Sequence, residues 1–340
     1  MAGAGALFLP IGASAATLPS ERGVNVTFYD YTAYPDSFIA SQSSAYASYL
    51  SGTLHANTVT VSFPLWTKSI RSNSVAAGVD PVAGNASTPT VDRLDVLVGA
   101  LTRAGLAVRL RPLINESALE LHDSWRGKLA PRNPSRWFAS YRAAIDPYVA
   151  LAERDHIASF VVETELQSLG GDPHWTSLIH HLAHRFSGTL EWDSTWGIHG
   201  GPGYTTKAGT TFAIDAYPKM HLGNHATVAQ LVSGWADYLA RNPLPVPPSV
   251  TVLQEVGILA STKMYAAPYL HAPPPGAVFQ SETQVRWFKA ACRIARRFGF
   301  KGISFNTFYL TVPIPSVDDP GRPQFFQPAG LSAISACFNR

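Results

Sequence analysis

The 340 residues are enough for one large α/β barrel or two ordinary domains, and 46% of them are hydrophobic, as in globular proteins. Charged residues make up only 14%, against roughly 25% in an average soluble protein, which argues against disorder and against a coiled coil. The formal net charge of +3 is not concentrated in any block, so the basic patch of a nucleic-acid binder is absent.

The first 19 residues are small and apolar, and Ala13-Ser14-Ala15 matches the A-x-A pattern of a signal-peptide cleavage site. A positively charged start is absent, so a disordered tail is the alternative for residues 1–20. We expect an exported, secreted or cell-envelope protein. No apolar run reaches the roughly 18 residues that span a bilayer, so no membrane span is expected.

From residue 21 onward, short apolar runs rich in β-branched residues alternate with longer amphipathic stretches. The runs predict eight strands, at residues 23–28, 57–63, 107–114, 157–163, 188–192, 212–215, 249–255 and 302–306. Apolar residues at a spacing of three to four predict helices at residues 38–50, 91–104, 135–154, 175–186, 228–240 and 282–298. The Gly-rich segment 197–209 is predicted to be a loop.

This alternation predicts an α/β fold, a (β/α)8 TIM barrel, that forms a single domain over residues 21–340. An open doubly wound sheet fits less well, because no G-x-G-x-x-G fingerprint follows the first strand. A barrel carries its reactive groups at the carboxyl ends of its strands.

Acidic side chains end two of the predicted strands. Glu163 and Glu165 follow the fourth apolar run, and Glu255 ends the seventh. Most glycosidases need two facing carboxyl groups. One protonates the leaving oxygen, and the other attacks the anomeric carbon or activates water. Any one of these acids can instead be paired with a basic residue for structure, but acids on both strands predict a glycosidase site.

Five motifs occur in the order and spacing of a known family. They are WRGKL at 125–129, WFASY at 137–141, ETEL at 163–166, FAIDAY at 212–217 and QEVG at 254–257. Over residues 55–310 the chain resembles glycoside hydrolase family 113, a β-mannanase family in a large clan of retaining barrels. The resemblance implies that Glu165 is the acid/base and Glu255 the nucleophile. It further implies a carbohydrate substrate, with neither a metal nor an organic cofactor.

Other residues are candidates for binding the substrate. Arg111, at the end of the third strand, can hold Glu255 ionised, and Tyr217 resembles the tyrosine that contacts the nucleophile in this clan. Such neighbours are expected to lower the pKa of Glu255 and to leave that of Glu165 raised. Further candidates for binding the substrate are Asn115, Arg126, Glu163, Asp215 and Asn306.

Three tryptophans fall in predicted loops at the active end of the barrel. Trp66, Trp125 and Trp196 lie after the second, third and fifth strands, where an indole face can stack on a sugar ring. Packing beneath a loop is the equally weighted alternative for each of them.

Several positions depart from the family pattern near the bond-cleaving subsite. Leu113 and Asn115 stand where a histidine and an aspartate are expected, and Phe305-Asn306 replaces the usual tryptophan. The catalytic pair is intact, but the sequence does not determine which sugar the site recognises. The alternatives to β-mannan are a furanose-containing cell-wall glycan cleaved by the same mechanism, and a carbohydrate-binding barrel without turnover.

Glu163 is a further departure, because a small residue is expected there. Strand alternation would place it on the same side as Glu165, where an unpaired charge would raise the pKa of Glu165. The favoured alternative is that Arg111 or Arg126 neutralises Glu163. Cys292 lies on the predicted helix 282–298, and Cys337 falls on the helix expected after the eighth strand. These last two helices are neighbours in a barrel, so the cysteines can form a disulfide or remain two buried thiols.

Overall fold

The computed structural model describes residues 18–195, 210–314 and 325–339. Most of the predicted leader, together with Trp196 and the loop 197–209, lies outside the described residues. None of the helices within the described ranges has the length and apolar character needed to cross a bilayer.

Eight parallel strands form a closed barrel, so the predicted (β/α)8 fold is confirmed. Around the barrel the strands follow the order β1, β10, β9, β8, β7, β6, β5, β3. Their bounds are β1 Glu21–Thr27, β3 Thr58–Leu65, β5 Ala107–Ile114, β6 Ser159–Thr164, β7 Thr189–Thr195, β8 Thr210–Asp215, β9 Thr251–Val256 and β10 Gly302–Tyr309. Each strand overlaps one of the runs predicted from the sequence.

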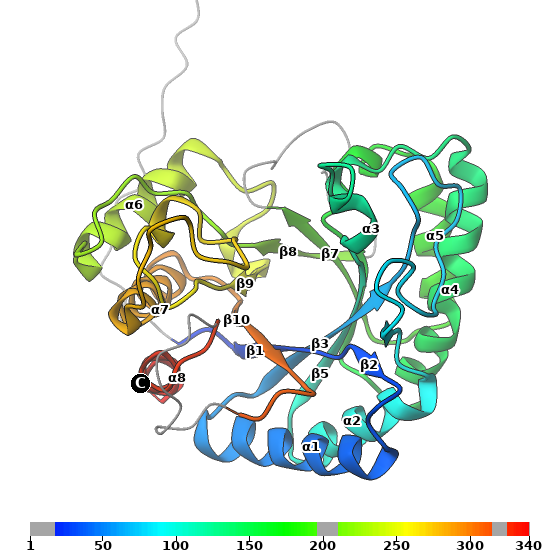
Figure 1. Ribbon diagram of the computed structural model, residues 1–340, viewed down its shortest axis with the longest axis horizontal. Coiled ribbons are helices and arrows are strands. Elements are labelled where there is room, and N and C mark those ends of the chain that lie inside the picture. Colours follow the sequence, from blue (N-terminus) through cyan, green and yellow to red (C-terminus); the bar gives the residue numbers. More distant parts are fainter. Residues whose placement is uncertain (1–17, 196–209, 315–324, 340) are drawn as a thin grey trace, which may run out of the picture.

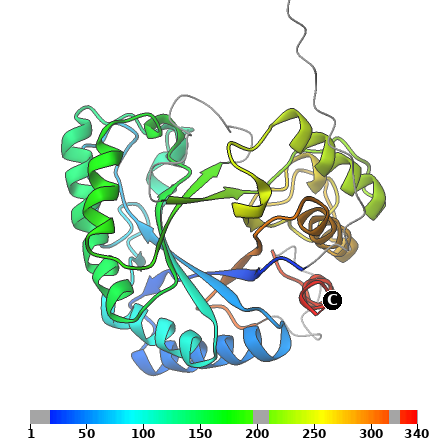
Figure 2. The same cartoon turned by 180° about the vertical axis from the view of Figure 1, so that it is seen from behind.

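Helices surround this barrel in both views (Figure 1, Figure 2). The longer ones in the described residues are α1 Asp36–Ser48, α2 Val91–Arg103, α4 Pro134–Arg154, α5 His174–Ala183, α6 Val228–Arg241, α7 Ser281–Phe298 and α8 Pro328–Phe338. Local signals set several boundaries. Thr227 and Gln230 form a capping box at the start of α6. The residue after α7 is Gly299, whose φ of 67° is favourable because glycine has no Cβ.

Shorter elements lie in the connections, and the periodicity of the sequence does not predict them. A small sheet joins β2 Asp30–Tyr31 to β4 Ala86–Ser87, and α3 spans Ser117–Glu120. Single helical turns occur at Tyr49–Thr53, Arg126–Lys128, Gln167–Leu169, Pro248–Val250 and Met264–Ala266.

The interior of the barrel is polar at two levels. At the lower level Arg109 of β5 reaches across to Glu21 of β1, at 2.7 Å, and to Glu191 of β7, at 2.9 Å. Two residues further along β5, Arg111 makes the equivalent contacts toward the carboxyl ends of the strands. Branched apolar side chains fill many barrels of this kind, whereas buried ion pairs occupy this one. The upper level forms the floor of the site described below.

Cys292 of α7 and Cys337 of α8 form a disulfide, with their Cα atoms 6.1 Å apart. Of the two alternatives that the sequence left open, the bridge is the one present. The guanidinium of Arg296 also donates to the carbonyl of Cys337 over 2.5 Å, so a second contact joins the last helix to α7.

Candidate active site

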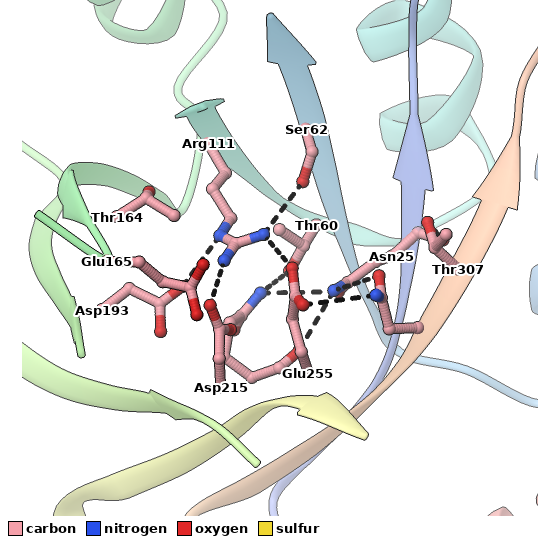
Figure 3. Close-up of polar contacts among 12 residues, drawn as sticks. Asn25, Thr60, Ser62, Arg111, Thr164, Glu165, Asp193, Asp215, Glu255 and Thr307 are labelled. Atoms are coloured by element: carbon pink, nitrogen blue, oxygen red, sulfur yellow. Dashed lines mark hydrogen bonds and ion pairs between the residues drawn. The ribbon is translucent and has the colours of Figure 1, made fainter. Parts of the chain in front are cut away.

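Arg111 is the centre of the site (Figure 3). It is 1% exposed and donates to three carboxylates from three different strands. Nε bonds Asp193 over 2.7 Å, Nη2 bonds Asp215 over 2.7 Å, and Nη1 bonds Oε1 of Glu255. A planar guanidinium with several donors suits such a hub, because each N–H points at a different acceptor. The aspartates fix Arg111, and Arg111 in turn fixes Glu255.

Glu255 receives further hydrogen bonds on its other oxygen. The hydroxyl of Tyr217 donates to Oε2 over 2.8 Å, and Asn306 donates to the same oxygen over 3.3 Å and to the Tyr217 hydroxyl over 2.7 Å. Burial alone would raise the pKa of Glu255, but the charge of Arg111 and the hydrogen bonds from Tyr217 and Arg111 outweigh it. The pKa therefore lies below its ordinary value, and Glu255 is an anion at neutral pH.

Glu165 follows β6 and faces Glu255 across the Arg111 guanidinium (Figure 3). Arg126 donates to its Oε2 over 2.5 Å and is itself held by the carbonyl of Ile114 at 2.8 Å. Burial raises the pKa of Glu165, the negative charge of Glu255 adds to the rise, and the positive charge of Arg126 only partly opposes it. One carboxyl group of the pair thus tends to keep its proton while the other is ionised, which is the pattern that divides acid and base roles.

The backbone of Glu165 is also unusual, since its φ is 54°. A side chain other than glycine in this left-handed region costs about 1–3 kcal/mol and persists only where the surroundings impose it. The N–H of Glu165 donates to the carbonyl of Asp193 on β7 over 3.0 Å. Tertiary contacts therefore hold the conformation that presents this carboxyl group.

Asp193 is a residue of the site that we did not predict. Burial raises its pKa to about 8, against the opposing charge of Arg111. Asp215, a predicted binding residue, has its pKa raised well above the ordinary value for the same reason. The sequence did contain a signal for Asp193, because Glu191 and Asp193 alternate with apolar residues in β7.

Asn115, one of the predicted binding residues, forms hydrogen bonds with other loop residues. Its amide nitrogen donates to the hydroxyl of Tyr29 over 3.0 Å, and its oxygen accepts from the N–H of Ser117 over 2.8 Å. Tyr29 was not predicted, and its ring stacks on Tyr309 with a centroid distance of 6.3 Å. Tyr29 follows β1 and Tyr309 is the last residue of the neighbouring β10, so both lie at the carboxyl end of the barrel.

The two described tryptophans differ. Trp66 is only 6% exposed, and its backbone exchanges hydrogen bonds with that of Ala76 over 2.9 and 3.0 Å. Packing beneath the loop accounts for it. Trp125 is partly buried, with its indole lying over Gly127, where an added Cβ would come within 2.4 Å of the ring. Its indole remains a candidate for contact with a sugar.

Glu163 does not have the basic partner that we favoured from the sequence. Arg111 and Arg126 bind other acids, and no ion pair of Glu163 occurs among residues 18–195, 210–314 and 325–339. Its Oε1 accepts the N–H of Leu166, while the buried Oε2 has no partner within these ranges. The expected neutralisation of Glu163 by arginine was therefore wrong.

The expected alternation in β6 was wrong as well. Pairing with β7 shifts between Val161 and Glu163, so Glu163 is in register with Trp192 rather than with an interior residue. The ring of Trp192 packs against Trp175 of α5, with a centroid distance of 5.0 Å. Residues in register on parallel strands share a face, so Glu163 belongs to the side of the sheet that the helices cover.

No cluster of three or more His, Cys, Asp or Glu side chains is placed to hold a metal ion in the described part of the chain. The side chains of the site provide an ionised carboxylate, a second carboxyl group that tends to be protonated, and the arginines and the tyrosine that hold them.

Solved structures share this fold at low sequence identity. A GH113 β-1,4-mannanase matches with a TM-score of 0.74 and 14% identity, over 95% of this chain and 100% of that chain. A GH113 β-mannanase from Alicyclobacillus acidocaldarius matches with a TM-score of 0.70 and 18% identity, over 96% and 99% of the two chains. A glycoside hydrolase family 5 mannosidase from Rhizomucor miehei has a TM-score of 0.52 and 11% identity, with coverage of 94% and 92%.

No curated protein sequence matches the chain. The model of Glycoside Hydrolase Family 113, in contrast, matches residues 27–197, just over half of the 340 residues. This segment includes Arg111, Arg126 and Glu165, while Glu255 lies beyond it. The resemblance noted in the sequence is thereby confirmed, and the chain belongs to Glycoside Hydrolase Family 113 and is a glycoside hydrolase.

Proposed function

We propose that this glycoside hydrolase cleaves β-mannan, or a related β-linked glycan, with retention of configuration through Glu165 and Glu255. The observation that carries the proposal is the facing pair of carboxyl groups whose pKa values are displaced in opposite directions. Arg111 and Tyr217 stabilise the anion of Glu255, as a nucleophile requires, and the burial of Glu165 favours the protonated form that a general acid requires.

In the first step, Glu255 attacks the anomeric carbon while Glu165 transfers its proton to the glycosidic oxygen, and the bond to the leaving sugar breaks. The product of this step is a glycosyl ester of Glu255. In the second step, the ionised Glu165 removes a proton from water, which attacks the same carbon and releases Glu255. Tyr217 and Arg111 hold one oxygen of Glu255 each, so the carboxylate enters the reaction already oriented.

The substrate is proposed from the family and from the structural relatives that are named as mannanases. Leu113, Asn115 and Asn306 depart from the family pattern near the scissile bond, which keeps a furanose-containing glycan as the second candidate. Asn115 donates to Tyr29 and Asn306 donates to Tyr217, and we propose that residues at these positions respond to the shape of the sugar ring.

Incubation of purified protein with a panel of glycans tests the proposal. We expect new reducing ends from β-1,4-mannan and glucomannan, with the β-anomer formed first when the products are followed by proton NMR. If new reducing ends form only from an arabinofuranose-containing glycan, the second candidate is favoured. Binding to a glycan without any cleavage, by protein whose fold is intact, would instead identify a carbohydrate-binding barrel.

The pH dependence of kcat/KM is predicted from the two pKa shifts. Glu255 must be ionised, and because its pKa is lowered, the acidic limb should lie below the ordinary value of 4.5. Glu165 must be protonated, and because its pKa is raised, the basic limb should lie above that value. A bell-shaped profile between these limbs is expected, and Glu165→Gln should lose the basic limb. A profile in which this variant keeps the limb would contradict the assignment.

We also propose that the protein is exported. The disulfide between Cys292 and Cys337 supports this, because such bonds persist in oxidising compartments and are rare in the reducing cytosol.

A further inference from the structure

Among the described residues, Glu163 is a buried acid beside the site that has no role in the proposed mechanism. It is 1% exposed, it is bound by no arginine among the described residues, and it lies on the helix-covered face of β6. Within the ranges that the structure describes, it accepts one hydrogen bond, from the N–H of Leu166, the residue that follows Glu165. This amide is the direct contact through which Glu163 can act on the backbone at Glu165.

The Leu166 amide is important because its position affects the conformation of Glu165. Glu165 has a left-handed φ of 54°, and the peptide groups on both sides of it determine where its side chain points. On one side, the N–H of Glu165 is held by the carbonyl of Asp193. On the other side, the N–H of Leu166 is held by the carboxyl oxygen of Glu163. Both amide hydrogens that flank this conformation are thus fixed, one by backbone and one by a side chain.

The surroundings of Glu163 favour its neutral form. Burial raises its pKa well above the ordinary value, and the charges of Asp193 and Glu165 add to the rise, against the opposing Leu166 N–H and Arg111. Tyr141 of α4, the other titratable group beside it, is itself a neutral phenol whose pKa burial raises. The second carboxyl oxygen, Oε2, is buried with no partner among the described residues, where a negative charge would be unsatisfied.

We propose that Glu163 is a positioning residue that acts as a neutral hydrogen-bond acceptor for Leu166 and so holds Glu165 in its working conformation. The inference rests on the proposed role of Glu165 as acid/base. It differs from charge tuning, because the neutral carboxyl group acts through the backbone and not through repulsion. An amide at position 163 should therefore replace the acid, whereas an apolar side chain should not.

Two aryl β-mannobiosides that differ only in the leaving group test the proposal. For Glu163→Leu we expect kcat/KM with the phenyl substrate to fall by roughly 30-fold or more, because general acid catalysis supplies about 10²–10⁴-fold when the acid is well placed. With the dinitrophenyl substrate, which needs no proton, kcat/KM should stay within about threefold of the parent. Glu163→Gln should stay within about threefold on both, because its amide oxygen still accepts from Leu166.

Tyr141→Phe provides a matched control for lost stability. The Tyr141 hydroxyl donates to the carbonyl of Val162 over 3.1 Å, so this variant removes another buried hydrogen bond of β6 without touching Leu166. A lower melting temperature with no preference for one leaving group is expected. If Glu163→Leu merely resembles this control, with both substrates affected equally, Glu163 is structural only and the proposal fails.

Glu163→Gln keeps the proposal testable if the leucine variant does not fold. A loss on the phenyl substrate alone in Glu163→Gln, or a basic limb of its pH profile that moves to lower pH, would show that the charged form matters and would overturn the proposal. An unmoved limb with near-parental rates supports it. Glu165→Ala is measured on the same substrates, and if that variant shows no leaving-group dependence, the proposed function itself has failed.

Discussion

Replacement of Glu255 by alanine is expected to lower kcat by roughly four to six orders of magnitude, on every substrate and at every pH. The variant cannot form a glycosyl ester at position 255, and the neighbouring acids Asp193 and Asp215 cannot replace Glu255 because Arg111 binds them. A better leaving group should not restore the rate, because the missing step is nucleophilic attack. Turnover of the phenyl and dinitrophenyl β-mannobiosides measures the loss.

Glu191→Gln is a suitable control for this variant. Glu191 is also a buried carboxylate paired with an arginine inside the barrel, at 2.9 Å from Arg109, but at the lower level. We expect it to lower the melting temperature and to leave turnover largely intact. If Glu255→Ala keeps more than about one-hundredth of the parental rate while Glu191→Gln behaves as expected, Glu255 is not the nucleophile.

Replacement of Glu165 by alanine is expected to separate the two substrates. With the phenyl β-mannobioside, kcat/KM should fall by about 10²–10⁴-fold, because its leaving group needs the proton. With the dinitrophenyl β-mannobioside, kcat/KM should remain near the parental value while kcat falls, because the glycosyl ester then waits for water that no base activates. A rapid initial release of dinitrophenolate followed by slow turnover is the signal to measure.

Azide supplies an independent check of the same variant. It is an anion at neutral pH and needs no base, so it should restore turnover of Glu165→Ala and yield a β-mannosyl azide. In Glu255→Ala, azide enters from the opposite face and would give the α-product. Equal loss on both aryl substrates, without rescue by azide, would contradict the role of Glu165 as acid/base.

The barrel was predictable because its signals are local. The eight strands appear as short apolar runs and most of the longer helices as a period of 3.6 within short windows, and the pair Thr227 and Gln230 is a capping-box pattern visible in the sequence. Glu165 and Glu255 were found because the carboxyl end of a barrel strand is a position that sequence alone identifies.

The environment of Glu163 was not predictable in this way. The strand pairing shifts between Val161 and Glu163. This shift depends on how β6 pairs with β7, and the sequence of neither strand alone predicts that pairing. Arg126 presents the same difficulty. It lies 39 residues from Glu165 in the chain, and only the loop after β5 brings its guanidinium to that carboxylate. Asp193, in contrast, was missed because the predicted strand ended at residue 192, whereas β7 continues to Thr195.

The disulfide changes what a single break in the chain can do. Cys292 and Cys337 are 45 residues apart, and between them runs β10, the strand that closes the barrel against β1. A protease that hydrolyses one peptide bond inside this covalent loop leaves both pieces joined through sulfur. The cleaved part of the loop and α8 then stay tethered to α7 at a high local concentration. A nicked molecule can therefore keep its barrel closed until a reductant breaks the disulfide.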